Sequence, residues 1–246
     1  MKMGCSDSKH RDSDYSDEGI KDVSRLTFDE GLVSLNLGSN QIADVSQLCL
    51  PKGLKKLHLE GNKIVDVSGL SLPEGLKELC LDSNQIVDVS GLTLPEGLTH
   101  LHLYDNQIVD VSGLSLPPGL TWLLLYHNQI VDVAQLSLPK GLKELNLGDN
   151  QIADVSRLGL PSALKTLNIF HNNISDLSCI NISDCPNLTL LRLSSNPVSP
   201  LEVGRLRQEL GEGCEVVAFN LLEPPAGGAC GLAPADLLAA SNPLSI

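Results

Sequence analysis

Histidine, cysteine and acidic residues recur at a fixed interval in the first half of the chain. His58, Cys80 and His102 follow one another 22 residues apart, and Asp82 stands two residues after Cys80. Imidazole, thiolate and carboxylate groups are the ligands that zinc prefers in proteins. If the three residues share a row across parallel strands, Cys80 and His102 can reach one zinc ion, whereas His58 and His102 lie about 9.6 Å apart. An open sheet also offers few groups that would orient the ligands, so the alternative is a set of solvated side chains on a variable surface.

Aromatic residues follow the same spacing. Only four occur between residues 32 and 196, and none of them takes a leucine position of the pattern described below. The core positions are already occupied by leucine, which explains why the aromatic residues lie elsewhere. It does not explain why six large side chains gather on two adjacent segments. Exposed patches of this kind mark binding sites, and Trp and Tyr dominate the energetics of protein interfaces. We therefore predict a protein-binding ring patch, defined as His100, His102, Tyr104, Trp122, Leu124 and Tyr126, with Phe170 and His58 as outlying members.

The charge of the chain predicts the character of its partner. Acidic residues outnumber basic ones by 30 to 17, for a formal net charge of −13, which argues against nucleic acid and anionic lipid as partners. Acidic residues also surround the ring patch: Glu60, Glu78, Asp82, Asp105, Glu144 and Asp149. A protein partner with basic residues around an apolar knob would complement this surface.

No pattern in the sequence supports catalysis. The chain has no nucleophile elbow, phosphate-binding glycine loop or Cys-x-x-Cys pair, so we predict neither an enzyme nor a cofactor. Aspartates recur every 22 residues from Asp44 to Asp176 and could suggest calcium. Asp before Val-Ser-x-Leu more often caps a short turn through its own backbone, and we favour that interpretation.

These spacings belong to an internal repeat. Eight asparagines are in phase, at intervals of 22 until a final interval of 24: Asn40, Asn62, Asn84, Asn106, Asn128, Asn150, Asn172 and Asn196. Around each lies Leu-x-x-Leu-x-Leu-x-x-Asn-x-Ile-x-Asp-Val, followed in most copies by Leu-x-Leu-Pro-x-Gly. Leu-x-Leu predicts a short strand, and stacked copies bury the leucines that one copy cannot bury alone. The asparagine should satisfy unpaired backbone groups of a buried bend, while Pro-x-Gly should supply a fixed and then a permissive φ.

At these residues the chain resembles leucine-rich repeat proteins with short repeats. "NQIVDVSGL" is similar to the phosphatase-regulator and internalin-like subclass, and "LPEGLKEL" resembles bacterial effector and slime-mould repeats. The resemblance implies an α/β fold: a right-handed solenoid with a curved parallel sheet on the concave side and 3₁₀ or extended segments on the convex side. It also implies a protein-binding scaffold, and a regulatory subunit of a phosphatase-like partner is one concrete version. The alternatives are a zinc-binding protein or metal-dependent enzyme at His58, Cys80 and His102, and a purely structural repeat protein. The longer step to Asn196, with Cys185-Pro-Asn in place of the usual return, makes regularity doubtful at that turn.

The two ends of the pattern suggest the organisation of the chain. Ile20 to Leu26 is half a repeat, closed by Phe28, while Ser199-Pro-Leu-Glu begins a capping helix that ends at Gly211. A final edge strand should follow at 214–219. We therefore expect a disordered acidic tail at 1–19, the capped solenoid at 20–222 and a flexible tail rich in Pro, Ala and Gly at 223–246.

The first residues raise the question of membrane attachment. No apolar run is long enough to span a membrane, and the irregularly spaced cysteines favour a reducing, cytoplasmic location. Gly4 would be a myristoylation site and Cys5 a palmitoylation candidate only if translation began at Met3. The alternative is a plain acidic tail. Oligomeric state and partner identity have no signal in the sequence.

Overall fold

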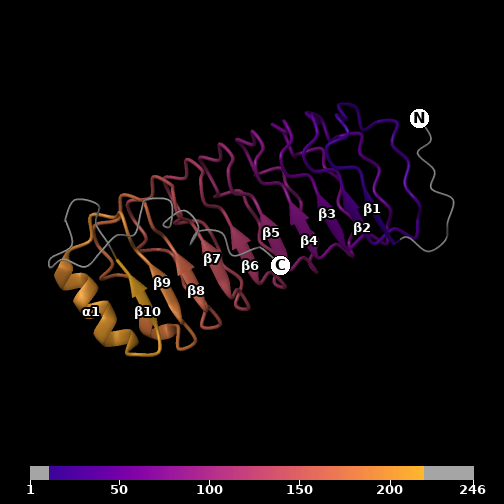
Figure 1. Cartoon of the computed structure of the whole chain (residues 1–246). Helices are drawn as coiled ribbons and strands as arrows, with labels where there is room; N and C mark the ends of the chain where they lie inside the picture. The colour runs from indigo at the N-terminus through magenta and orange to yellow at the C-terminus, as the bar shows by residue number, and fades with distance from the viewer. Residues whose placement is uncertain (1–10, 219–246) are drawn as a thin grey trace, which may run out of the picture.

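The computed structural model describes residues 11–218 as a solenoid of stacked coils in which ten parallel strands pair in chain order (Figure 1). The strands are β1 (Asp12–Asp14), β2 (Ser34–Asn36), β3 (Lys56–His58), β4 (Glu78–Cys80), β5 (His100–His102), β6 (Trp122–Leu124), β7 (Glu144–Asn146), β8 (Thr166–Asn168), β9 (Leu190–Arg192) and β10 (Glu215–Val217). The 3₁₀ helix η1 (Ile182–Asp184) precedes β9, and the helix α1 (Pro200–Leu210) precedes β10.

The register of the sheet is the one that the 22-residue period predicts. Leu79 at the centre of β4 pairs with Leu57 on one side and with Leu101 on the other, and all three are fully buried. Burial of one leucine side chain stabilises a fold by about 1.5–3 kcal/mol. Because the side chains of a strand alternate, the residues on either side of each central leucine point outward. These outward side chains form what we call the sheet face.

The repeat asparagines join consecutive coils. The Asn106 amide donates hydrogen bonds to the carbonyl oxygens of Leu103 (3.2 Å) and of Leu81 in the preceding coil (3.0 Å). Its Oδ1 accepts a hydrogen bond from the Ile86 N–H at 3.0 Å. The prediction that asparagine satisfies a buried bend is confirmed. The structure adds that the same side chain ties each coil to the coil before it.

Left-handed backbone occurs at a different place from the one predicted. The glycine of the Pro-x-Gly return, such as Gly119, does not have a positive φ, so the expectation of a permissive φ at this position is wrong. A Cβ on Gly119 would lie 3.1 Å from the Glu96 carbonyl oxygen, so this glycine leaves room for the neighbouring coil, whereas a Cβ on the equivalent Gly141 would meet nothing within 4 Å. Positive φ values belong to the residue before each repeat asparagine, for example Asp105 at 54° and Gly61 at 64°.

The repeat aspartates cap turns outside the sheet, as predicted. Oδ1 of Asp88 accepts a hydrogen bond from the Ser90 N–H at 2.8 Å, and Asp66 and Ser68 make the same contact. Five of these aspartates, from Asp66 to Asp154, also form isolated parallel bridges from coil to coil. The Ser90 N–H, and then the Ser90 hydroxyl, hold the pKa of Asp88 below its ordinary value.

The N-terminal cap is larger than the sequence suggested. Within the predicted disordered tail 1–19, residues 12–14 form β1 and pair with β2, so that prediction is wrong for the part of the tail that the structure describes. Tyr15 and Phe28 are partly buried against the core with ring centroids 6.1 Å apart. The Asn40 amide donates to the Tyr15 carbonyl oxygen at 2.8 Å. A complete first coil therefore stands where half a repeat was expected.

The C-terminal end follows the predicted order of helix and edge strand. Ser199 caps α1 by accepting a hydrogen bond from the Glu202 N–H at 3.2 Å, and the helix ends at Gly211. Leu206 is fully buried against the last coils. The irregular coil before β9 absorbs its two extra residues around η1, and β9 still pairs with β8 in register.

Some predictions fall on residues that the structure does not describe. Gly4 and Cys5 lie in segment 1–10, and the predicted C-terminal tail lies within 219–246. Lipidation and tail flexibility therefore stay predictions. Within residues 11–218 no helix is both long and apolar enough to cross a membrane.

Candidate functional site

The ring patch lies on the sheet face of β5 and β6 and on the residues that follow these strands. His100 pairs with Trp122 and His102 pairs with Leu124 across the two strands. All six members of the patch are half-buried, while Leu123 and Leu125 beside them are fully buried. The predicted assignment of faces is therefore confirmed, and the ring-bearing side chains are open to solvent.

Two stacked pairs organise the patch. The His100 and Trp122 rings are 4.7 Å apart between centroids and 10° from parallel, and the Tyr104 and Tyr126 rings are 4.4 Å apart and 7° from parallel. The strand spacing of about 4.8 Å suits such stacking, because in-register residues on neighbouring strands bring their rings to nearly that separation. Stacked aromatic pairs stabilise by about 0.5–1.5 kcal/mol beyond the area they bury. The patch therefore holds its rings in place without help from a ligand.

Hydrogen bonds fix the first pair at both ends. The Trp122 indole N–H donates to the Glu144 carboxylate on β7 at 2.6 Å. On the other side, the Thr99 hydroxyl and the His100 Nδ1 are 2.9 Å apart. Burial lowers the pKa of His100, which favours the neutral ring. The pair therefore presents a broad, uncharged aromatic surface.

The second pair is held in its neutral form. Burial raises the pKa of Tyr126 to about 12, and burial together with the nearby Asp82 raises the pKa of Tyr104 further. Both phenols therefore remain protonated at neutral pH. Their hydroxyl groups place polar atoms at the edge of an otherwise apolar surface.

The two outlying residues do not join the ring contacts. A Cβ on Gly148 would lie 2.2 Å from the Phe170 ring, so this ring covers the glycine on the neighbouring coil. His58 lies on β3, two strands away from β5, and its Nδ1 is 3.6 Å from the Glu60 carboxylate. Phe170 and His58 thus belong to the same face as the patch but lie outside its stacked centre.

Most of the surrounding acidic residues already have partners. Lys56 Nζ is 2.9 Å from the Glu78 carboxylate, and Glu144 accepts from Trp122. Asp149 lies between two histidines of neighbouring coils, pairing with His171 and approaching His127 at 3.6 Å. Sequence reasoning missed this pairing, although the 22-residue spacing of the three coils could have indicated it.

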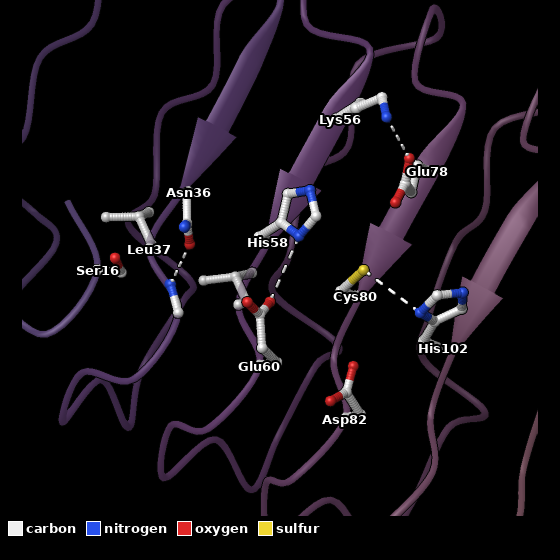
Figure 2. Close-up of polar contacts among 12 residues, drawn as sticks. Ser16, Asn36, Leu37, Lys56, His58, Glu60, Glu78, Cys80, Asp82 and His102 are labelled. Carbon is white, nitrogen blue, oxygen red and sulfur yellow. Dashed lines mark hydrogen bonds and ion pairs between the residues drawn. The ribbon is translucent and has the colours of Figure 1, made fainter. Parts of the chain in front are cut away.

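A second cluster lies beside the patch, around the Cys80 thiol (Figure 2). Cys80 Sγ is 3.5 Å from His102 Nδ1, and the Asp82 carboxylate and the Glu60 carboxylate approach from the ends of the strands. His58, Cys80 and His102 project on the same side of three neighbouring strands, as predicted (Figure 2). Sequence reasoning placed Asp82 beside them but did not count it among the ligands.

Burial controls the protonation of this cluster. Desolvation raises the pKa of the Cys80 thiol and lowers the pKa of the His102 ring. Desolvation also raises the pKa of Asp82 to about 6, although its hydrogen bond with Tyr104 acts in the opposite direction. The neighbouring Glu60 carboxylate raises the pKa of His58. The cluster therefore combines metal-ligating groups with a low-dielectric setting.

Comparison with known proteins finds a family that matches part of the repeat region. A family described as Leucine Rich repeats (2 copies) matches residues 118–160 and 162–203. Among curated proteins, none matches this chain.

Solved structures with a similar fold include two internalins of Listeria monocytogenes. The internalin inlF superposes with a TM-score of 0.61 and 28% identity, covering 78% of this chain, and this chain spans only 62% of that internalin. Internalin C2 (inlC2) gives a TM-score of 0.62 and 27% identity, with 77% of this chain and 82% of that chain covered. YopM from Yersinia enterocolitica is similar in fold alone, with a TM-score of 0.53 and 24% identity over 81% of this chain and 44% of that chain.

Proposed function

We propose that this leucine-rich repeat protein is a non-catalytic scaffold that binds a protein partner through the ring patch. Leucine-rich repeat solenoids typically serve as scaffolds for protein interactions, and the chain has this fold. The observation that carries the proposal is the pair of ring stacks, His100–Trp122 and Tyr104–Tyr126, held side by side on the sheet face.

Pre-organisation is what makes the patch suited to binding. Ordering a rotamer-rich side chain on association costs about 0.5–1.5 kcal/mol, and rings that are already stacked avoid most of that cost. Trp122 is also held by Glu144, so its position does not depend on a partner. Aromatic anchors of this kind are where the binding energy of protein interfaces concentrates.

The surroundings suggest the chemistry of the partner. The formal net charge is −13, and the exposed Asp105 and the half-buried Asp149 lie at the rim of the patch. An apolar knob flanked by Lys or Arg would match both the rings and the rim. The resemblance of the repeats to phosphatase regulators makes a phosphatase catalytic subunit the first protein to test. A cytoplasmic location remains part of this proposal.

The proposal is tested by affinity capture from lysate of the source cells, followed by measurement of Kd for the captured protein. Trp122→Ala together with Tyr126→Ala should weaken binding by about 2 kcal/mol or more, which is roughly a 30-fold rise in Kd. The variant should still fold, since neither side chain lies in the leucine core, with a loss of about 1–3 kcal/mol from the two ring stacks.

Two matched variants separate binding from folding. Val87→Ala together with Val109→Ala removes side chains that are 45% and 44% exposed outside the sheet, and should leave Kd unchanged. Leu125→Ala should cost about 2–5 kcal/mol of stability while keeping the patch residues. Capture of the same proteins at the same level by wild type and the ring variant would refute the proposal.

A further inference from the structure

The cluster around Cys80 contains more ligating groups than the sequence indicated. Ligand atoms of Cys80, Asp82 and His102 all lie within 4.8 Å of one another, and so do those of His58, Glu60 and Cys80. Three successive strands, β3 to β5, supply these side chains, and Figure 2 shows them on the same side of the sheet. Cys80 belongs to both groups and therefore lies at the centre of the cluster.

The distance between the thiol and the imidazole suits one shared ion. With Zn–S near 2.3 Å and Zn–N near 2.0–2.1 Å, two ligands of a tetrahedral zinc ion are separated by about 3.5 Å. Cys80 Sγ and His102 Nδ1 are 3.5 Å apart. A zinc ion could therefore bind between them without movement of the backbone.

Asp82 removes the geometric difficulty of a site built from His58, Cys80 and His102. That set spans three strands, whereas Cys80, Asp82 and His102 span only the neighbouring strands β4 and β5. Cys80 and Asp82 are each only 5% exposed, so their groups face the protein more than bulk water. Asp82 also lies beside Tyr104, whose ring is held by stacking on Tyr126, so that the phenol can orient the carboxylate. Ligand orientation of this kind strengthens metal binding.

Glu60, beside the cluster, independently indicates that a positive charge would be stabilising there. Its Oε2 is buried and accepts no hydrogen bond, and the nearest cation is His58 Nδ1 at 3.6 Å. The carboxylate is pressed against Gly38, where a Cβ would lie 2.5 Å from Oε1. A buried carboxylate oxygen without a donor is costly, and a nearby positive ion would offset that cost.

We propose that Cys80, Asp82 and His102 bind one Zn²⁺ ion, with a solvent molecule as the fourth ligand. His58 and Glu60 would lie on the other side of Cys80 and add negative charge and a hydrogen-bonding imidazole to the surroundings of the ion. On binding, the Cys80 thiol releases its proton to solvent and coordinates as the thiolate. The mixed set of sulfur, nitrogen and oxygen ligands favours Zn²⁺ over Mg²⁺ or Ca²⁺, which prefer oxygen ligands alone.

The test uses the full chain, stripped of metal with a chelator and kept reduced, and titrated with Zn²⁺ alone by calorimetry. One ion per chain should bind, and Co²⁺ in its place should give the thiolate-to-cobalt absorption band of a tetrahedral site. Cys80→Ser and His102→Gln should each raise the Kd for Zn²⁺ by 100-fold or more and remove that band. Because His102 is half-exposed, His102→Gln should fold even if Cys80→Ser does not, and circular dichroism would verify this.

The matched controls are Cys49→Ser and His127→Gln, which change an exposed thiol and an exposed imidazole elsewhere and should leave Zn²⁺ binding intact. Binding below one ion per chain, or equal loss in the control variants, would overturn the site. Because the titration uses no protein partner, its failure would leave the proposed scaffold function untouched.

Discussion

At the residue scale, each repeat asparagine stabilises the solenoid more than a short polar side chain usually does. Asn106 is only 9% exposed and contacts the backbone of two coils. An asparagine offers both a donor and an acceptor, so one side chain satisfies carbonyl groups and an N–H group at once. The hydroxyl groups of Ser and Thr have a single donor, so among short side chains only asparagine can donate to two carbonyl groups and also accept from an N–H.

We predict that Asn106→Ala destabilises the solenoid strongly. The substitution leaves the Ile86 N–H without its partner in a buried bend. It also removes one of the two asparagine amides that donate to each of the Leu81 and Leu103 carbonyl groups. With about 1–3 kcal/mol for the unsatisfied N–H and about 0.5–1.5 kcal/mol for each of the two lost hydrogen bonds, the free energy of unfolding should fall by about 2 kcal/mol or more. Denaturant unfolding monitored by circular dichroism measures this loss.

The matched control is the neighbouring Gln107→Ala, an exposed position that should change stability by less than about 0.5 kcal/mol. Asn106→Asp should resemble Asn106→Ala, because a carboxylate can accept from Ile86 but cannot donate to carbonyl oxygens. If Asn106→Asp kept wild-type stability, the donor contacts would be unimportant.

At the element scale, the capping aspartates make the stability of the turns outside the sheet depend on pH. The pKa values of Asp44, Asp66, Asp88 and Asp154 are all lowered by hydrogen bonds from the serine two residues on. A lowered pKa in the folded state means that the contribution is complete above the unfolded pKa, about 3.9. It is lost as the pH falls through the folded pKa.

We therefore expect the urea midpoint of unfolding to fall below about pH 4 more steeply in wild type than in a variant with these four aspartates replaced by asparagine. Asparagine keeps an acceptor for the serine N–H but does not titrate in this range. Above pH 5 the two profiles should run parallel, because the groups that still titrate there, such as Asp82 and His58, are the same in both proteins. Parallel profiles down to pH 3 would show that the caps do not contribute to acid sensitivity.

The strands were predictable because the leucine period survives in almost every coil, and β1 shows where it fails. In the first coil Ser13, Tyr15 and Glu18 occupy the positions that hold Leu, Leu and Asn elsewhere. The strand still forms, because the backbone pairs with β2 and Asn40 donates to Tyr15. The leucine period reveals strands whose side chains are buried in the core. The end coil lacks this period and is held mainly by hydrogen bonds to the neighbouring coil.

The candidate site was predictable in position but not in detail. The repeat interval placed Trp122 beside His100, but the stacking of their rings depends on rotamers that a sequence does not specify. In the same way, the proximity of Asp82 to Cys80 and His102 follows from a side-chain direction at the end of a strand. Sequence spacing fixes the rows of a sheet, and packing decides which members of a row touch.

At the scale of the whole molecule, the solenoid is a linear stack in which each strand pairs only with the strands before and after it. Stability of such a stack is close to a sum over coils and their interfaces. Every internal junction from Asn40 to Asn172 repeats the same bonds, so the coils are interchangeable in their contacts, though they differ on the sheet face. Deletion of one complete coil should therefore change binding without preventing folding.

We predict that removal of residues 107–128, one complete coil, leaves a folded solenoid that has lost partner binding. The deletion joins Asn106 to Gln129, so β5 would meet β7 in the register that β6 provides now. It also removes Trp122, Leu124 and Tyr126, which leaves His100 and Tyr104 without their stacking partners. Circular dichroism should show a cooperative transition, while Kd for the partner should rise at least as much as in the ring variant.

Removal of residues 41–62 is the matched deletion, because it takes out another 22-residue coil and leaves β5 and β6 intact. This protein should fold and keep its partner, since the coil of β4 still separates the stacked pairs from the new junction. A deletion out of phase, of residues 107–117, would put Gly119, Trp122 and Pro139 where Ile108, Val111 and Asn128 now lie, and should prevent folding. If both whole-coil deletions bound the partner equally well, the contact surface would lie elsewhere on the solenoid, and the stacked rings of β5 and β6 would be only a feature of its surface.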